Sequence, residues 1–238
     1  MPSMKRPAAA PSNTSAKMRK TAWRPHPAHQ QQPQVSKRPC RDVWYCSDCS
    51  GLEVGALALK RIFKEFKHWF ASEMDPATRK VLKATHPNVE AIFEDATKHD
   101  LGHLRRARLN HSEALLIYTS GFPCQPFSRE GKRQGSADPR GQVVYHELGL
   151  INELLPDLVI FENVKDLATD KKYAAFFQEV LGFLTMIRQK LYLVDWNILD
   201  SYTHGPVPAS RKRLYIVAVR KDRLQTSWDW PSELRPLP

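Results

Sequence analysis

The first 41 residues contain no aspartate or glutamate, although they hold nine lysines and arginines. Because the whole chain of 238 residues has a formal net charge of +11, this segment accounts for most of the net positive charge. It also contains seven prolines and no periodic apolar pattern. Such a segment buries too little apolar surface to offset its conformational entropy. We therefore expect a disordered basic arm over residues 1–41 and one folded domain over residues 42–238.

The lack of acid in this arm is compatible with several roles. The run "KMRK" at residues 17–20 is typical of a nuclear localisation signal or of a patch that binds nucleic-acid phosphates. An acid-free N-terminus is also typical of an organelle transit segment, and a solvated arm without a specific partner is an equal alternative. We expect a nuclear protein, with an organelle or the cytoplasm as the alternative locations.

Other missing features exclude further classes of protein. No apolar run approaches the roughly 18 residues of a membrane span, and no secretory signal opens the chain, so we expect no membrane partner. The four cysteines are too few and too unevenly spaced for a disulfide scaffold, which favours a reducing compartment; they are Cys40, Cys46, Cys49 and Cys124. No G-x-x-x-x-G-K-[ST] loop is present, and this disfavours a phosphate-transfer enzyme.

Beyond the arm, strand patterns alternate with helical patterns. Apolar, β-branched runs predict strands near residues 43–47, 67–74, 89–96, 114–120, 157–164, 191–199 and 213–220. Apolar residues at helical spacing lie between several of these runs, in three groups: Leu59, Ile62, Phe63 and Phe66; Val144, Leu148, Ile151 and Leu155; and Tyr173, Phe177, Val180, Leu184, Ile187 and Leu191. This order predicts an α/β fold with a mostly parallel sheet and helices on both faces.

Five residues that could carry chemistry fall at the predicted carboxyl ends of strands, where sheets of this kind bind ligands. They are Gly51, Glu73, Asp95, Cys124 and Glu162. A glycine turn lets a ligand approach the backbone, Glu73 could accept hydrogen bonds from ribose hydroxyls, and Asp95 could hold an adenine amino group. Taken alone, each carboxylate is more simply a solvated loop residue or a helix cap. Together they indicate a nucleoside cofactor.

The thiol in "GFPCQPFS" (residues 121–128) has a simple and a chemical interpretation. A free cysteine is often a small buried hydrophobe, but a thiolate held at a strand end is a soft nucleophile suited to an electron-poor ring carbon. A carboxyl such as Glu162 beside it would make a pyrimidine more electrophilic. A Cys–His hydrolase using His146 or His204 is a weaker rival. The spacing "CSDC" resembles half of a zinc site, but no second ligand pair follows, so we expect no metal.

Several motifs resemble those of the carbon-5 cytosine DNA methyltransferases, over roughly residues 43–230. "GFPCQPFS" followed by "GKRQGSADPRG" is similar to the family's catalytic-loop signature, and "ENV" at residues 162–164 to its second catalytic motif. "RKRLYIVAVR" resembles its paired-arginine strand. "FASEMDPATRKVLKATHP" and "EDATKHD" resemble its ribose and adenine segments.

The resemblance implies a Rossmann-like fold that binds S-adenosylmethionine, and a cytosine flipped out of the duplex. It implies that Cys124 attacks carbon 6 of the ring, that Glu162 polarises the base, and that Arg211 and Arg213 position it. The cofactor-binding residues that it implies are Ser50, Gly51, Leu52, Glu73, Met74, Asp95, Ala96, Pro123 and Val143. The DNA-binding residues are Gln125, Ser128, Arg129, Lys132 and Arg133.

The sequence departs from the family pattern in two places and in length. Glu53 and Val54 stand where the usual cofactor loop has paired glycines, and Ala209 stands where many members have glutamine. Both departures are closer to the vertebrate de novo type. No counterpart of the target-recognition domain or of the last conserved segment is present, so we expect a truncated domain with weak activity. A transfer-RNA methyltransferase and a catalytically weak module that binds S-adenosylmethionine and nucleic acid are the alternatives.

Overall fold

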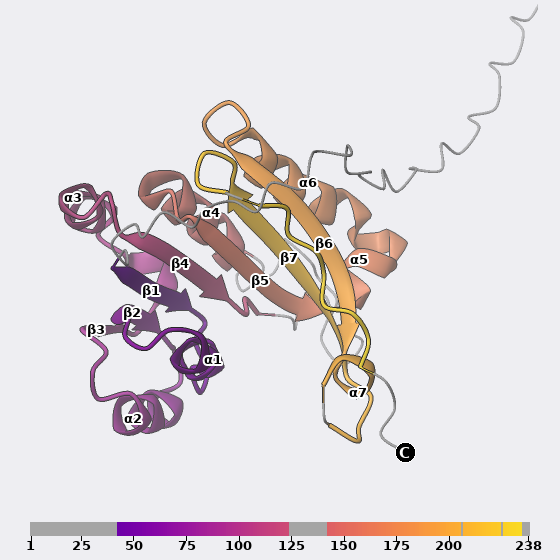
Figure 1. The fold of residues 1–238 in the computed structure, drawn as a ribbon, viewed down its shortest axis with the longest axis horizontal. Coiled ribbons are helices and arrows are strands. Elements are labelled where there is room, and N and C mark those ends of the chain that lie inside the picture. The colour runs from indigo at the N-terminus through magenta and orange to yellow at the C-terminus, as the bar shows by residue number, and fades with distance from the viewer. Residues whose placement is uncertain (1–41, 124–141, 206, 225, 235–238) are drawn as a thin grey trace, which may run out of the picture. The chain divides into compact units, whose positions relative to one another are not determined.

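The computed structural model describes residues 42–123, 142–205, 207–224 and 226–234. They contain one seven-stranded sheet with the strand order β3-β2-β1-β4-β5-β7-β6 (Figure 1). The strands are β1 (Val43–Asp48), β2 (Lys67–Ser72), β3 (Ala91–Phe93), β4 (Leu115–Ser120), β5 (Leu158–Val164), β6 (Tyr192–Asp200) and β7 (Lys212–Arg220). Strands β1 to β5 pair in parallel, whereas β7 pairs antiparallel with β5 and with β6. The prediction of a mostly parallel sheet is confirmed.

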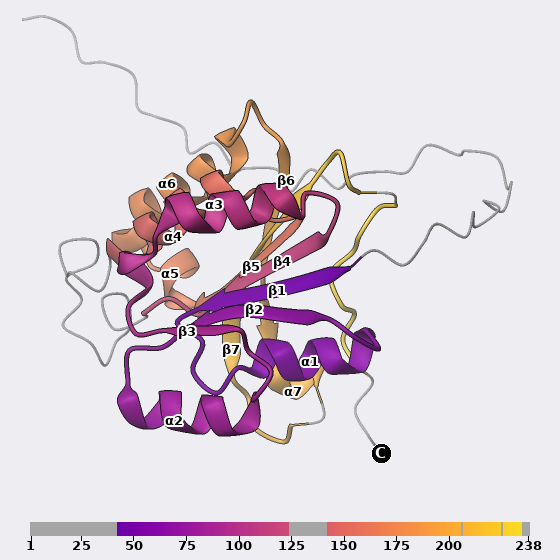
Figure 2. The same ribbon diagram turned by 90° about the vertical axis from the view of Figure 1, so that its left-hand side faces the viewer.

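Helices cover both faces of this sheet, as predicted. Helices α3, α4 and α6 lie on one face, and α1 and α2 lie on the other (Figure 2). The helical segments are α1 (Val54–Ile62), α2 (Pro76–Thr85), η1 (Ala96–Lys98), α3 (Leu101–Asn110), α4 (Val143–Leu154), α5 (Asp166–Thr169), η4 (Lys171–Tyr173), α6 (Ala174–Met186) and α7 (Ser201–His204). None of the helices in the described ranges is long and apolar enough to cross a membrane.

Alternation along the strands divides the core into two layers. In β1, Trp44 and Cys46 join the larger cluster beneath α3, α4 and α6, whereas Val43 and Tyr45 join a smaller cluster with residues of α1. All six residues of β1 are buried because both faces of the sheet are covered at this strand. The central strands therefore carry apolar side chains on both faces.

Two helix predictions differ from the structure. The stripe expected through Phe66 ends early, because α1 stops at Ile62, which is 71% exposed, and Phe63 is already extended. Phe63 and Phe66 still pack against the smaller cluster, so their apolar character reflects a loop that covers the core. Similarly, α6 ends at Met186, before the last two residues of the predicted stripe.

Helix α3 was not predicted, and its composition explains why. Its sequence is "LGHLRRARLN", and only Leu104 and Arg108 are buried. An arginine occupies a position where a periodic apolar pattern would need a hydrophobic residue. The helix forms because Asp100 caps it, accepting a hydrogen bond from the His103 backbone amide.

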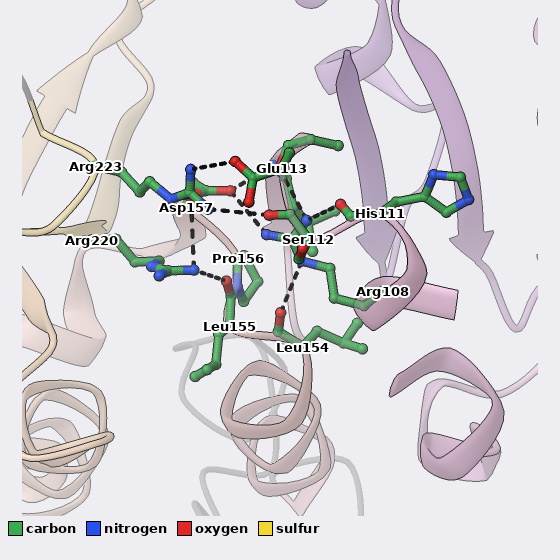
Figure 3. Close-up of polar contacts among 12 residues, drawn as sticks. Arg108, His111, Ser112, Glu113, Leu154, Leu155, Pro156, Asp157, Arg220 and Arg223 are labelled. Carbon is green, nitrogen blue, oxygen red and sulfur yellow. Dashed lines mark hydrogen bonds and ion pairs between the residues drawn. The ribbon is translucent and has the colours of Figure 1, made fainter. Parts of the chain in front are cut away.

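At the amino end of β5, three arginines converge on one buried carboxylate (Figure 3). Asp157 is 3% exposed and accepts hydrogen bonds from Arg108 Nη2 at 3.2 Å and from the Leu116 backbone amide at 2.8 Å. Arg223 Nε lies 3.3 Å and Arg220 Nη1 lies 3.8 Å from its other oxygen. The cluster joins α3, the start of β4, the start of β5 and the turn after β7.

Replacing Asp157 with Asn should destabilise the domain by about 3 kcal/mol, because it leaves three partly buried guanidinium groups without their shared counter-ion. Urea unfolding measures this change. The control is Asp222→Asn: Asp222 pairs with Arg220 at 2.6 Å but is half exposed, so its loss should change the free energy of unfolding by less than about 1 kcal/mol. Equal effects of the two substitutions would show that the cluster is not a stabilising centre.

Candidate active site

The carboxyl ends of β1 to β5 meet along one edge of the sheet, and the predicted cofactor residues lie there (Figure 1). Gly51 follows β1 with a φ of +54°, and a Cβ built on it would meet no atom within 4 Å. Glu73 follows β2, and its Oε2 accepts a hydrogen bond of 2.9 Å from the Gly51 amide. The glycine turn and the first carboxylate are therefore in direct contact, beside open space.

Asp95 follows the neighbouring strand β3. Its Oδ1 accepts hydrogen bonds from the Thr97 amide at 2.9 Å and the Thr97 hydroxyl at 2.7 Å. These bonds lower the pKa of Asp95, so the carboxylate is ionised near neutral pH. Because β2 and β3 are paired, Glu73 and Asp95 present two acids at adjacent strand ends, as a nucleoside site requires.

The remaining predicted cofactor residues lie on the same loops. Leu52 and Met74 are 57% and 68% exposed, so each presents an apolar side chain to solvent beside Gly51 and Glu73. Ser50 is half-buried, and its hydroxyl accepts a hydrogen bond from the Ser72 amide, which joins the first loop to β2. Ala96 opens η1, Pro123 follows β4 after Gly121 and Phe122, and the buried Val143 opens α4.

Glu162 lies near the end of β5 and pairs with Arg213 of β7, whose Nε is 2.9 Å from Glu162 Oε1. Burial raises the pKa of Glu162, and the guanidinium groups of Arg213 and Arg211 offset part of that rise. Arg211 is exposed, and its backbone amide donates to Asp200 Oδ1. The structure thus brings together three of the four predicted catalytic residues.

The loop that leads to Cys124 begins beside Glu162. A Cβ built on Gly121 would lie 3.7 Å from Glu162 Oε2, and Asn163 Nδ2 donates a hydrogen bond of 3.1 Å to the Phe122 carbonyl. These contacts hold the start of the loop against β5. The predicted residues farther along it lie outside the described residues: Cys124, Gln125, Ser128, Arg129, Lys132 and Arg133.

A pocket of about 270 Å³ opens over the Glu162–Arg213 pair, lined by Tyr215 and His204 among others. Tyr215 was not assigned to the site from the sequence, and His204 was considered only for the rival Cys–His hydrolase. Asp200, also in the lining, accepts hydrogen bonds from the Tyr202 amide, the Ser210 hydroxyl and the Arg211 amide. Asp200 therefore holds both ends of the segment between β6 and β7 that carries Arg211. This role could not be predicted from the sequence, because Asp200 and Arg211 meet only when β6 and β7 pair.

Two buried acids contact residues near these strand ends, and the sequence patterns did not indicate either of them. Asp48 accepts hydrogen bonds from the Tyr118 hydroxyl at 2.8 Å and contacts His99 Nε2 at 2.8 Å. Glu147 of α4 is fully buried and accepts a hydrogen bond from Ser120, the last residue of β4. Burial, and next the nearby Asp48 charge, raise the pKa of Glu147 well above its usual range.

The two cysteines of "CSDC" have different neighbours. Cys46 Sγ lies against the Ile117 carbonyl, whereas Cys49 Sγ lies 3.6 Å from Glu147 Oε1. Within the described ranges, no group of three or more histidine, cysteine, aspartate or glutamate side chains could hold a metal ion.

Arg213→Gln should raise the pKa of Glu162, because the nearest charge that favours the carboxylate is removed. The proton then stays on Glu162 to a higher pH, and carbon-13 NMR of the glutamate carboxyls measures the shift. The control is Arg105→Gln, an exposed arginine that pairs with Glu153 on α4. An unchanged Glu162 titration in the Arg213 variant would contradict the pairing.

Comparison with known proteins places these features in one family. Residues 46–236 match the family model described as C-5 cytosine-specific DNA methylase. The type II methyltransferase M.NgoBV of Neisseria gonorrhoeae is 33% identical over 165 residues, which are 67% of this chain and 36% of that protein. M.AquIA of a Picosynechococcus strain is 30% identical over 190 residues, 78% of this chain and 73% of that protein.

A solved structure agrees with the fold. The Dnmt2 methyltransferase of S. pombe has a TM-score of 0.57 and 23% identity, covering 79% of this chain and 53% of that chain. The chain spans little more than a third of the length of the first curated relatives that it matches. The match over residues 46–236 nevertheless includes every described element of the sheet except the first residues of β1, and the chain belongs to the C-5 cytosine-specific DNA methylase family.

Proposed function

We propose that this protein is a DNA cytosine-5 methyltransferase that uses S-adenosylmethionine. The observation that carries the proposal is the position of the Glu162–Arg213 pair against the backbone that enters the cysteine loop. A thiol in that loop and a carboxyl with a raised pKa are the two groups that addition to a pyrimidine ring needs. The family description supports DNA as the substrate.

The residues at the first three strand ends fit the cofactor. Open space above Gly51 leaves room for a ligand against the backbone, and Glu73 and Asp95 supply acceptors for ribose and adenine. Leu52 and Met74 are exposed apolar side chains beside them that a purine ring could cover. S-adenosylmethionine, when bound, supplies the methyl group that carbon 5 of the cytosine accepts.

The chain's own residues would act on the base as follows. Cys124 Sγ forms a bond to carbon 6 of a cytosine flipped out of the duplex. Glu162, whose pKa is raised by burial, would bind the ring nitrogen and amino group and so polarise the ring for this addition. Arg213 orients Glu162. After methylation, the carbon 5 proton would pass to solvent water, its electron pair would restore the ring double bond, and the bond to carbon 6 would break to release the Cys124 thiolate.

Contacts with the nucleic-acid backbone would come from the loop after Cys124. Arg129, Lys132 and Arg133 can pair with phosphates, and Gln125 and Ser128 can donate hydrogen bonds. The basic arm over residues 1–41 would add non-specific affinity that decreases with salt. A nuclear location stays a prediction, since the first curated relatives are bacterial enzymes.

The protein should form a denaturant-resistant adduct with DNA that contains 5-fluorocytosine when S-adenosylmethionine is present. Fluorine at carbon 5 blocks the final elimination, so the Cys124 bond to carbon 6 persists. Denaturing gel electrophoresis detects the adduct. Cys124→Ala should abolish it, whereas Cys49→Ala, which removes a thiol hydrogen-bonded to Glu147, should retain it.

Two results would contradict the proposal. An adduct that survives Cys124→Ala would exclude this thiol as the nucleophile. An adduct formed with the matching 5-fluorocytosine RNA but not with DNA would favour the transfer-RNA enzyme instead.

Glu73→Ala and Asp95→Ala should each weaken S-adenosylmethionine binding about tenfold or more, since a charge-assisted hydrogen bond contributes about 1.5–3 kcal/mol. Isothermal titration calorimetry measures the affinity. Glu90→Ala is the control, because Glu90 pairs with Lys67 at the opposite end of β2. Unchanged affinity in both test variants would show that the cofactor does not occupy these strand ends.

A further inference from the structure

Glu53 occupies a position that is unusual for a glutamate. It is the N-cap residue of α1, with φ 60° and ψ 49°, a left-handed conformation that favours glycine. Its side chain is nevertheless 1% exposed, whereas the side chains on either side, Leu52 and Val54, are 57% and 69% exposed. The backbone therefore turns so that one carboxyl points into the core while its neighbours face solvent.

Hydroxyl groups of β1 hold this buried carboxyl. The Tyr45 hydroxyl donates to Glu53 Oε1 at 2.6 Å, and the Ser47 hydroxyl donates to Oε2 at 2.6 Å. His68 Nε2 lies 3.8 Å from Oε2, but burial lowers the pKa of His68 to about 4, so this contact is not an ion pair near neutral pH. The carboxyl is thus fixed by two short hydrogen bonds to the strand beneath it.

The sequence around Glu53 is adapted to this arrangement. A Cβ built on Gly55 would overlap the Tyr45 hydroxyl, so Gly55 leaves the space through which that hydroxyl reaches Glu53. The same hydroxyl lies 2.7 Å from Thr119 Oγ1 of β4. Tyr45, Glu53, Gly55 and Thr119 therefore form one unit that joins the start of α1 to two central strands.

This unit lies directly beneath the cofactor turn. The Glu53 amide donates to the Ser50 carbonyl at 2.9 Å, closing the turn that contains Gly51. The Ser50 hydroxyl contacts the Ser47 hydroxyl at 2.7 Å. On its outer side, the Gly51 amide donates to Glu73. The turn is therefore held from within by Glu53 and from the rim by Glu73.

We propose that Glu53 is a positioning residue, which fixes the S-adenosylmethionine turn through Tyr45 and Ser47 in place of the paired glycines of the usual loop. The inference rests on the proposed use of S-adenosylmethionine. A turn that is fixed before the ligand arrives loses less conformational freedom on binding, so Glu53 should contribute to cofactor affinity without touching the cofactor.

The experiment compares the full chain with Glu53→Ala, Glu53→Gln and the control Glu65→Ala, an exposed acid in the segment after α1. Calorimetry with S-adenosylmethionine and urea unfolding are measured for each. We expect Glu53→Ala to weaken binding about tenfold, because two hydroxyl groups lose their acceptor. Glu53→Gln should weaken it less, since its amide keeps one acceptor oxygen and can donate to Ser47. Glu65→Ala should bind like the wild type.

A second pair of variants separates positioning from a general loss of stability. Tyr45→Phe removes only the hydroxyl, and it should weaken cofactor binding when Glu53 is present but not in the Glu53→Ala background, because the two residues act as one unit. Additive effects of the two substitutions on affinity would overturn the inference, as would wild-type affinity in Glu53→Ala. If the wild-type chain itself binds no S-adenosylmethionine, the proposed function fails and this inference fails with it.

Discussion

The antiparallel placement of β7 between β5 and β6 is the constraint on which the candidate active site depends. Because β7 runs opposite to β5, its first residues lie beside the last residues of β5, with Val164 opposite Arg213 and Glu162 opposite Tyr215. A parallel strand in this place would bring its last residues to the same edge, and the arginine pair at the start of β7 would lie at the far end of the sheet. The ion pair between Glu162 and Arg213 therefore follows from strand direction.

The arginine cluster at the opposite end of the sheet serves the same pair of strands. Asp157 immediately precedes β5, and Arg220 is the last residue of β7, so their contact fixes the register of β5 and β7 at one end. A slip of one residue would turn every side chain of a strand to the opposite face, and it would separate Glu162 from Arg213. The buried charges around Asp157 and the geometry of the candidate active site are thus linked through β5 and β7.

The sequence allowed the strands, the fold class and the position of most site residues to be predicted, because those features depend on local pattern. Apolar runs locate β1 to β7, and the rule that ligands bind at carboxyl ends groups Gly51, Glu73, Asp95 and Glu162. The features that could not be predicted depend on distant partners. From the sequence, Arg108 would be placed on the surface, because it lies in a basic segment and its partner Asp157 is distant in the chain. Similarly, nothing in "SGLEVG" indicates that Glu53 contacts Tyr45.

The two glutamates buried near the candidate active site, Glu53 and Glu147, differ from the partly buried Asp95 at the same edge of the sheet. Burial raises the pKa of both, and each is held by hydroxyl groups, Tyr45 and Ser47 for the first and Ser120 for the second. Asp95 is more exposed, and hydrogen bonds lower its pKa.

The carboxyls at this edge of the sheet therefore fall into two sets, the buried pair Glu53 and Glu147 and the less buried pair Glu73 and Asp95. A buried carboxyl that accepts hydrogen bonds from hydroxyl groups can fix a loop at a lower cost than an unpaired charge in the interior would have. Glu73 and Asp95 lie nearer the solvent at the strand ends, where a ligand with hydroxyl and amino groups could reach them. The buried pair can therefore hold the turn after β1 and the end of β4 in place, which leaves Glu73 and Asp95 available to the proposed cofactor.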